Sequence, residues 1–312
     1  MKKTITLVFL LMTVNAIAQN KETIYLTKGD TLQNYYTTLI PDSASKGLLV
    51  ILGGFCTNPE EIMQETNLPV TACKAGYTVV MPYLLNDCDS IDIKNVYPTR
   101  LMTLVPQFIK KYNIPSGKFI IGGHSLGGHR ALFYAEQVFK LNNANVIKPT
   151  AVFGVDPPLN LRRLWNGFEY GAKIAFSKTG SQESTEQMRR FKIIYGGSPS
   201  QVPKKYEAFS SYYPDAIDGG NIKYLKNIPV RLYCDPDVKW WVENRRSRLE
   251  HVNLTDLVGA ISQLKLLGNQ KAELITALGK GFWANGQRHP HAFSILDADE
   301  FVTWANTILS AK

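Results

Sequence analysis

The segment Gly123-His124-Ser125-Leu126-Gly127 could present a serine hydroxyl for nucleophilic attack. It matches G-x-S-x-G, in which the two glycines permit a sharp turn between a strand and a helix. The apolar run Phe119-Ile120-Ile121 precedes it and an amphipathic pattern over 126–141 follows it. We therefore expect Ser125 at the tip of a strand-to-helix turn, with its Oγ pointing into a cleft.

A serine hydroxyl is a poor nucleophile until a base takes its proton, so the sequence should supply a histidine. His289 and His291 fall in a loop between the last predicted strand and the last predicted helix, where a base could reach the strand ends. We favour His291, because Ala292 and Phe293 can pack its ring, and keep His289 as the alternative. A metal site at this His-x-His is not expected, since no cysteine or carboxylate ligand set lies near it. The remaining histidines are too close to the serine in sequence or lack supporting context: His124, His129 and His251.

The base needs a carboxylate that fixes its tautomer and stabilises the imidazolium ion. A predicted strand over 230–234 ends in Asp235-Pro236-Asp237, which places two acids just past a strand end. We favour Asp237 over Asp235, because Asp235 precedes a proline and is held extended. Asp156, which follows the preceding predicted strand, is the third candidate. The chain order Ser125, Asp237, His291 is the one expected for this arrangement.

Two N–H donors are needed for the oxyanion that forms when a serine attacks a carbonyl carbon. The backbone N–H of Leu126 is the first, at the positive end of the helix that begins there. The second should come from Gly53-Gly54-Phe55-Cys56, which follows the apolar strand pattern over 48–52. Two glycines let this backbone approach a substrate closely. Phe55 is the preferred second donor and Cys56 is the alternative.

The elements that must position these groups alternate between strand and helix. A hairpin pattern around Lys28-Gly29-Asp30 comes first, over 23–40. This alternation predicts an α/β fold with a mostly parallel sheet covered on both faces. The break in rhythm, about 157–227, is too long for a plain loop, and we expect a cap-like insertion over the carboxyl ends of the strands. Strand patterns lie at 48–52, 77–81, 119–121, 151–155, 230–234 and 273–278, and helical patterns at 59–74, 101–112, 126–141, 254–267 and 298–309.

The first 18 residues are typical of a signal peptide, with Lys2 and Lys3 before a short apolar run and Ala16-Ile17-Ala18 as the cleavage site. The remaining chain, 19–312, is then an exported domain, periplasmic or extracellular. It has no apolar run of 18 residues that could span a membrane. Export permits one or two disulfide bonds, although four cysteines are too few for a disulfide scaffold. The pairing among Cys56, Cys73, Cys88 and Cys234 stays open.

The formal net charge of +9 does not indicate a nucleic-acid partner, because the basic residues are spread out rather than gathered in a stripe. The densest basic cluster, 244–248, is read as a solvated helix face. A hydrophobic share of 45% supports a full core, which excludes intrinsic disorder. No pattern assigns an oligomeric state.

With its GHSLGG stretch and its GGF stretch, the chain resembles the α/β-hydrolase superfamily over nearly all of 45–312. The usual His-Gly opening of the oxyanion loop is Gly-Gly here. The resemblance implies an eight-stranded, mostly parallel sheet, no cofactor and a covalent acyl-enzyme that water releases. We therefore expect a serine hydrolase acting on a carboxylic ester, with a small-molecule or carbohydrate-linked substrate. The alternatives are a peptidase or thioesterase with the same residues, and a catalytically silent binding protein of the same fold.

Overall fold

The computed structural model describes residues 20–29, 33–84 and 96–310. The expected signal segment, 1–18, and Cys88 lie outside the described residues. Within the described part, no helix is both long enough and apolar enough to cross a membrane.

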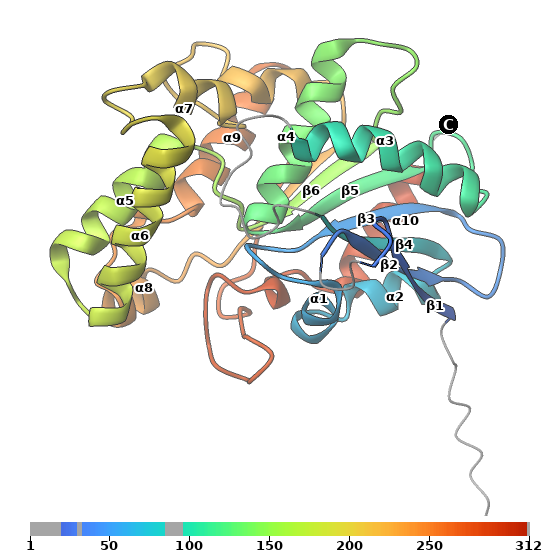
Figure 1. Ribbon diagram of the computed structural model, residues 1–312, viewed down its shortest axis with the longest axis horizontal. Helices are drawn as coiled ribbons and strands as arrows, with labels where there is room; N and C mark the ends of the chain where they lie inside the picture. The colour runs from blue at the N-terminus through green and yellow to red at the C-terminus, as the bar shows by residue number, and fades with distance from the viewer. Residues whose placement is uncertain (1–19, 30–32, 85–95, 311–312) are drawn as a thin grey trace, which may run out of the picture.

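The centre of the described chain is one sheet with the strand order β1-β2-β4-β3-β5-β6-β7-β8 (Figure 1). Strands β1 and β2 pair antiparallel, as do β2 and β4, and every later pairing is parallel. The expected α/β class with a mostly parallel sheet is confirmed. The strands are β1 (Asn20–Tyr25), β2 (Tyr35–Ile40), β3 (Gly47–Leu52), β4 (Tyr77–Tyr83), β5 (Phe119–His124), β6 (Ala151–Val155), β7 (Val230–Cys234) and β8 (Ala272–Thr276).

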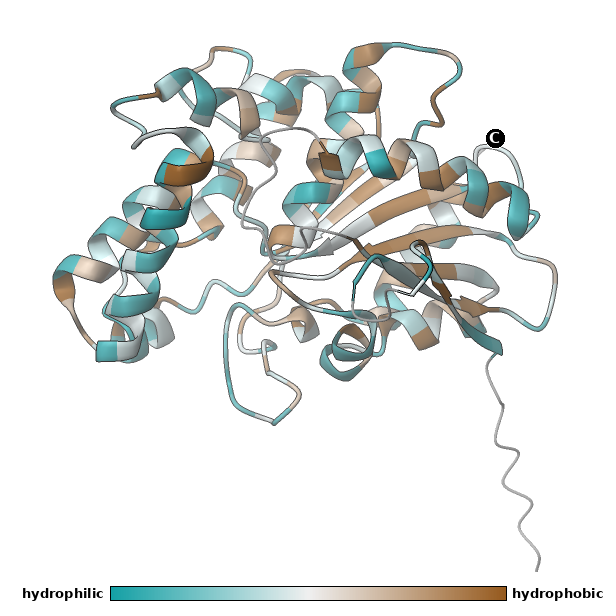
Figure 2. Cartoon of the chain, viewed as in Figure 1, coloured by the Kyte–Doolittle hydropathy of each residue, from teal (hydrophilic) through white to brown (hydrophobic). Residues whose placement is uncertain are grey.

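Helices cover both faces of this sheet, so the central strands have no solvated side. Every residue of β3 is buried, which is why its sequence is a continuous apolar run rather than an alternating one. In Figure 2 the central strands are coloured mostly apolar, whereas the helices carry both apolar and polar residues. One face packs against α3 (Val96–Lys111), α4 (Leu126–Leu141) and α9 (Leu254–Leu266), and the other against α1 (Pro59–Glu65), α2 (Leu68–Lys74) and α10 (Ala298–Ser310).

The helix expected over 59–74 is two helices, α1 and α2, that meet at Thr66 and Asn67. Helix α1 begins with a capping box, in which Asn58 and Glu61 satisfy each other's backbone N–H groups. Pro69 lies in the first turn of α2, where its missing N–H costs nothing, but it would break a continuous helix. The helical period continues across this break, so periodicity alone could not reveal it.

Between β6 and β7 the chain forms α5 (Leu161–Ile174), α6 (Lys178–Tyr195), α7 (Pro203–Phe209) and the short 3₁₀ helix η1 (Gly220–Leu225). Helices α5, α6 and α7 share a separate apolar cluster that includes Trp165, Phe191 and Tyr206. Leu126, the first residue of α4, belongs to this cluster as well. The segment therefore packs directly above the residue that follows Ser125. Helix α8 (Val238–Arg245) comes after β7, and its end faces the connection between α5 and α6, where the Arg246 guanidinium lies over the Phe176 ring.

Candidate active site

Ser125 occupies the turn between β5 and α4 with φ 53° and ψ −124°, a conformation that residues other than glycine rarely adopt. Its N–H donates to the carbonyl of Val155 at 2.9 Å, which ties the turn to the neighbouring strand β6. A Cβ atom at Gly123 or at Gly127 would lie 2.2 Å from the carbonyl oxygen of Leu52. Both positions must therefore be glycine for α4 to start this close to β3.

His291 connects Ser125 to a carboxylate. Its Nε2 lies 2.9 Å from Ser125 Oγ, and its Nδ1 lies 2.5 Å from Asp156 Oδ2. The Asp156 side chain is 8% exposed, whereas His291 is 27% exposed and borders open space. The three groups form one hydrogen-bonded row from a buried carboxylate to an accessible hydroxyl. This is the geometry in which an imidazole can take a proton from a serine.

The structure does not bring Asp237, the favoured acid, to His291, nor does it bring Asp235 there. Asp237 caps α8 by accepting from the N–H of Trp240 at 2.9 Å, and it pairs with Arg288. Asp235 is buried, accepts from two backbone N–H groups of the loop after β8, and also pairs with Arg288. Both β7 acids are thus used to fix the loop that carries the histidines. The acid beside the imidazole is Asp156, one strand earlier.

His289, the alternative base, does not contact Ser125. Its ring is buried and stacks on Trp283 with 4.2 Å between ring centroids. Burial, together with unfavourable electrostatic interactions with His291 and Arg245, lowers the pKa of His289 to about 3, so its ring is neutral near pH 7. Its Nδ1 accepts a hydrogen bond from the backbone N–H of His291 at 3.1 Å. His289 therefore holds the backbone of the residue that faces the serine.

A network of polar side chains that the sequence did not reveal holds the backbone of Asp156. Asn253 donates from Nδ2 to the Asp156 carbonyl at 2.8 Å, and the same nitrogen lies 3.5 Å from Asp156 Oδ2. Arg163 donates to Asn253 Oδ1 at 2.7 Å and forms a buried ion pair with Asp256. Asp256 also accepts from the N–H groups of Leu159 and Asn160. In the sequence, Asn253 and Asp256 would be read only as a helix start.

The two elements that carry the proposed oxyanion donors, α4 and the loop after β3, both adjoin Ser125. Leu126 is the first residue of α4, so no intrahelical carbonyl can accept its N–H. The loop after β3 approaches from β3, and a Cβ at Gly54 would be 3.5 Å from Ser125 Cβ. Phe55 is exposed and its ring lies under the Arg190 guanidinium of α6.

Cys56, the alternative donor, has φ 59° and lies in the turn closed by the Thr57 N–H and the Gly54 carbonyl. It is disulfide-bonded, whereas Cys73 and Cys234 are free and buried. Burial raises the pKa of Cys73 to about 11 and that of Cys234 to about 12, so neither thiol competes as a nucleophile near pH 7.

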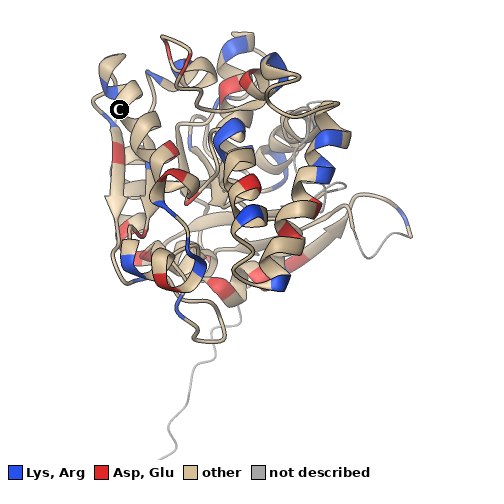
Figure 3. Ribbon diagram, turned by 90° about the vertical axis from the view of Figure 1, so that its left-hand side faces the viewer, with Lys and Arg blue, Asp and Glu red and all other residues tan. Residues whose placement is uncertain are grey.

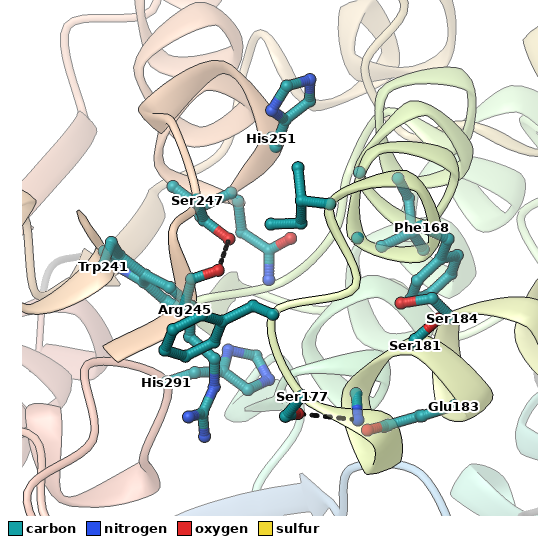
Figure 4. A pocket seen from close by; sticks show the side chains of 18 of the residues that line it. Phe168, Ser177, Ser181, Glu183, Ser184, Trp241, Arg245, Ser247, His251 and His291 are labelled. Atoms are coloured by element: carbon teal, nitrogen blue, oxygen red, sulfur yellow. Dashed lines mark hydrogen bonds between the residues drawn. The ribbon is translucent and has the colours of Figure 1, made fainter. Parts of the chain in front are cut away.

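Next to the histidine lies a cavity of about 510 Å³, bounded by the α5–α6 segment on one side and by α8 on the other (Figure 4). Asp156, His289 and His291 line it, and Arg245 and Trp241 of α8 form one wall. The opposite wall is apolar at α5 and carries serine hydroxyls near the start of α6. No group of three metal-binding side chains occurs in the ranges that the structure describes.

Comparison with solved structures places this architecture among known folds. No family model matches the sequence, and no curated protein matches it significantly. A truncated carbohydrate esterase from gut microbiota superposes with a TM-score of 0.62 at 15% identity, covering 94% of this chain and 97% of that one. An esterase from Rhizomucor miehei gives 0.57 at 15% identity, covering 93% and 84%.

An esterase of the bacterial hormone-sensitive lipase family gives a TM-score of 0.54 at 13% identity, covering 93% of this chain and 84% of that one. Matches at this level of identity establish the fold rather than the reaction. The sheet has eight strands in the order β1-β2-β4-β3-β5-β6-β7-β8, and Ser125 has a positive φ in the turn between β5 and α4. This chain therefore has the α/β-hydrolase fold.

Proposed function

We propose that the protein is a serine hydrolase that cleaves carboxylic esters. In the first half of the reaction, Ser125 Oγ attacks the ester carbonyl carbon while His291 Nε2 takes the hydroxyl proton. The carbonyl oxygen becomes an oxyanion between the N–H of Leu126 and the N–H of Phe55. His291 then gives its proton to the leaving alcohol, and the acyl group stays on Ser125.

The second half repeats these proton transfers with water as the nucleophile. His291 removes a proton from water, hydroxide attacks the acyl carbon, and the proton returns to Ser125 Oγ as the acid leaves. Asp156 keeps the Nδ1 proton on the imidazole and stabilises the ring while it is positively charged. The ring of His124 lies 4.8 Å from that of His291, and burial holds the pKa of His124 well below its usual value. A neutral neighbour avoids a second positive charge beside the imidazolium.

The observation that carries this proposal is the row Ser125–His291–Asp156, with a 2.9 Å contact at the nucleophile. A silent binding protein would have no need for a left-handed serine in contact with an accessible imidazole. The structural neighbours that are named as esterases favour an ester over an amide or a thioester. A peptidase or thioesterase would use the same groups, and a substrate panel separates the three.

The test is labelling by a fluorophosphonate probe, followed by turnover of para-nitrophenyl esters, matched thioesters and peptides. We expect the probe on Ser125 and no labelling or turnover in Ser125→Ala. Ser184→Ala is the control for labelling, because Ser184 lines the neighbouring cavity but does not contact His291. Labelling that survives in Ser125→Ala, or that disappears in Ser184→Ala, would contradict the assignment.

The proposed compartment is periplasmic or extracellular. The proposal is supported by the charged and apolar pattern of the first 18 residues and by the disulfide bond of Cys56, since such bonds persist in oxidising compartments. Mass spectrometry of the expressed protein should find Gln19 at the amino end. An intact Met1 on the folded enzyme would contradict export by cleavage.

A further inference from the structure

The basic cluster at the end of α8, residues 244–248, contacts aromatic rings. Three guanidinium groups each lie over an aromatic ring: Arg245 over Trp240, Arg246 over Phe176 and Arg248 over Tyr170, at 5.1, 5.4 and 4.7 Å from the ring centroids. Of these three arginines only Arg245 lines the cavity beside His291. The cluster thus places one cation inside the cavity and two outside it.

Arg245 has no carboxylate partner in the part of the chain that the structure describes. Its Nη1 donates to the carbonyl of Asn244 at 3.0 Å, and its Nη2 lies 3.5 Å from His289 Nε2. The other arginine of the cavity, Arg163, is neutralised by Asp256. Arg245 therefore keeps donors that face the cavity, and Figure 4 shows its side chain extending beside His291.

Two carboxylates also border this cavity, and neither neutralises Arg245. Asp156 is held by His291. Glu183 lies on the α6 wall, opposite Arg245 in Figure 4, and forms no ion pair among the described residues. An Arg that faces a cavity without a partner suits a planar anion, because its fork can donate two parallel hydrogen bonds to a carboxylate.

The position of the cavity indicates which part of an ester enters it. Asp156, His289 and His291 line it, but neither Leu126 nor Phe55 does. In the proposed reaction, the leaving oxygen receives its proton from His291, which lines the cavity. The acyl oxygen points instead to the N–H groups of Leu126 and Phe55, which do not line it. The alcohol part of the ester therefore extends into this cavity.

Resting on the proposed function, we propose that the preferred substrates are esters whose alcohol part carries a carboxylate, and that Arg245 binds this carboxylate. The Trp241 and Trp283 side chains, which line the cavity and both contact the His289 ring, give a ring-bearing alcohol an apolar surface. The preference does not come from a general positive field. Figure 3, in which the left-hand side of Figure 1 faces the viewer, shows acidic and basic residues interspersed along the ribbon.

The test uses two pairs of esters that differ only by a carboxylate or its carboxamide. For the alcohol side the pair is para-acetoxybenzoate and para-acetoxybenzamide. For the acyl side it is the para-nitrophenyl esters of para-carboxybenzoate and para-carbamoylbenzoate. The quantity compared is the ratio of kcat/KM within a pair, measured in the parent and in each variant, so that differences in intrinsic reactivity cancel.

Arg245→Gln should lower the acetoxybenzoate-to-acetoxybenzamide ratio by about 10- to 100-fold, the range expected for loss of a charge-assisted pair of hydrogen bonds. Arg245→Lys should restore part of the ratio, since it keeps the charge without the fork. The matched control is Arg246→Gln, one residue further on and outside the cavity, which should leave the ratio as in the parent. The acyl pair should not respond to Arg245→Gln.

Three results would overturn the inference. An unchanged acetoxybenzoate-to-acetoxybenzamide ratio in Arg245→Gln would show that Arg245 does not bind the carboxylate. An equal fall of this ratio in Arg246→Gln would show that the preference comes from the positive charge of the whole cluster. A response of the acyl pair in place of the alcohol pair reverses the assignment of the cavity.

A binding experiment keeps this inference separate from the proposed reaction. In Ser125→Ala, titration with para-hydroxybenzoate should quench the fluorescence of the cavity tryptophans, whereas para-hydroxybenzamide should bind at least about tenfold more weakly. Adding Arg245→Gln should remove the difference. If this discrimination is present but the parent hydrolyses no ester, the proposed function fails and the anion site stands. If esters are hydrolysed without discrimination, the anion site fails alone.

Discussion

The adjacent strands β6 and β7 are each followed by an aspartate and a proline, but the two aspartates have different roles. Asp156-Pro157 follows β6, and Asp235-Pro236 follows β7. Asp156 has a left-handed backbone (φ 45°) and its carboxylate meets His291. Asp235 is not left-handed, and its carboxylate binds backbone N–H groups of the loop after β8.

The difference lies in what surrounds each turn. At β6, the Asp156 N–H donates to the Tyr233 carbonyl of β7, and Asn253 binds the Asp156 carbonyl. Tyr233 in β7 and Asn253 at the start of α9 supply this support, and both are distant from Asp156 in sequence. At β7 the carboxylates meet Arg288, which belongs to the histidine loop itself. One turn therefore orients the imidazole, while the other anchors the loop from which it projects.

The largest effect should come from replacing the acid that touches the imidazole. Asp156→Asn should lower kcat by about 10³–10⁴-fold, because an amide favours the wrong tautomer and cannot stabilise the charged ring. The matched change Asp237→Asn should lower kcat far less. Ester hydrolysis by both variants measures this, with circular dichroism to verify folding. A greater loss in Asp237→Asn would reverse the comparison of the two turns.

Asp235→Asn should act mainly on stability. The amide keeps one acceptor but places an NH₂ group against the N–H of Gly279 or Gly281, and Arg288 loses a buried partner. We expect the free energy of unfolding to fall by about 3 kcal/mol, measured by urea denaturation. Asp237→Asn, at the partly exposed end of the same pair, should cost less. Equal losses would mean that burial does not distinguish the two acids.

The histidine loop should also make the fold sensitive to acid. The pKa of His289 is about 3 in the folded chain and near 6.5 when unfolded, so the unfolded state binds more protons between these values. The contribution of this group to the free energy of unfolding is complete above pH 6.5 and is lost as the pH falls toward 3. Between pH 7 and pH 5, His289 should account for a loss of about 2 kcal/mol.

His289→Asn is the comparison for this pH effect, since an amide oxygen can still accept from the His291 N–H. Urea denaturation at both pH values should show a smaller acid loss in the variant than in the parent. An identical loss in both would assign the acid sensitivity to other groups, such as His129, whose pKa burial lowers to about 4.

The smallest effect should come from the network beneath Asp156. Asn253→Ala removes the hydrogen bond to the Asp156 carbonyl and leaves Arg163 with one fewer partner. We expect kcat to fall about tenfold, as for other supporting contacts that orient a working group. In the Asp156→Asn background the same change should add little, since both act through the His291 ring. Full additivity would show that Asn253 acts elsewhere.

Most of the fold could be predicted because it follows from short-range patterns: apolar runs, helical periods and the glycine spacing around Ser125. The choice of acid could not. Asp156 and Asp237 both follow a strand. Their different roles depend on contacts with Asn253 and Arg288, respectively, which lie in distant parts of the chain. The same applies to Arg245, whose place inside a cavity depends on the packing of α8 against the α5–α6 segment.

The most direct test of the central claim is proton NMR of the hydrogen bond between His291 and its carboxylate partner. A proton on Nδ1 that is shared with a carboxylate at 2.5 Å resonates far downfield of other ring protons. We predict that this resonance is present in the parent, remains in Asp237→Asn and disappears in Asp156→Asn. Its loss in Asp237→Asn together with its survival in Asp156→Asn would contradict the assignment of the acid to the β6 turn.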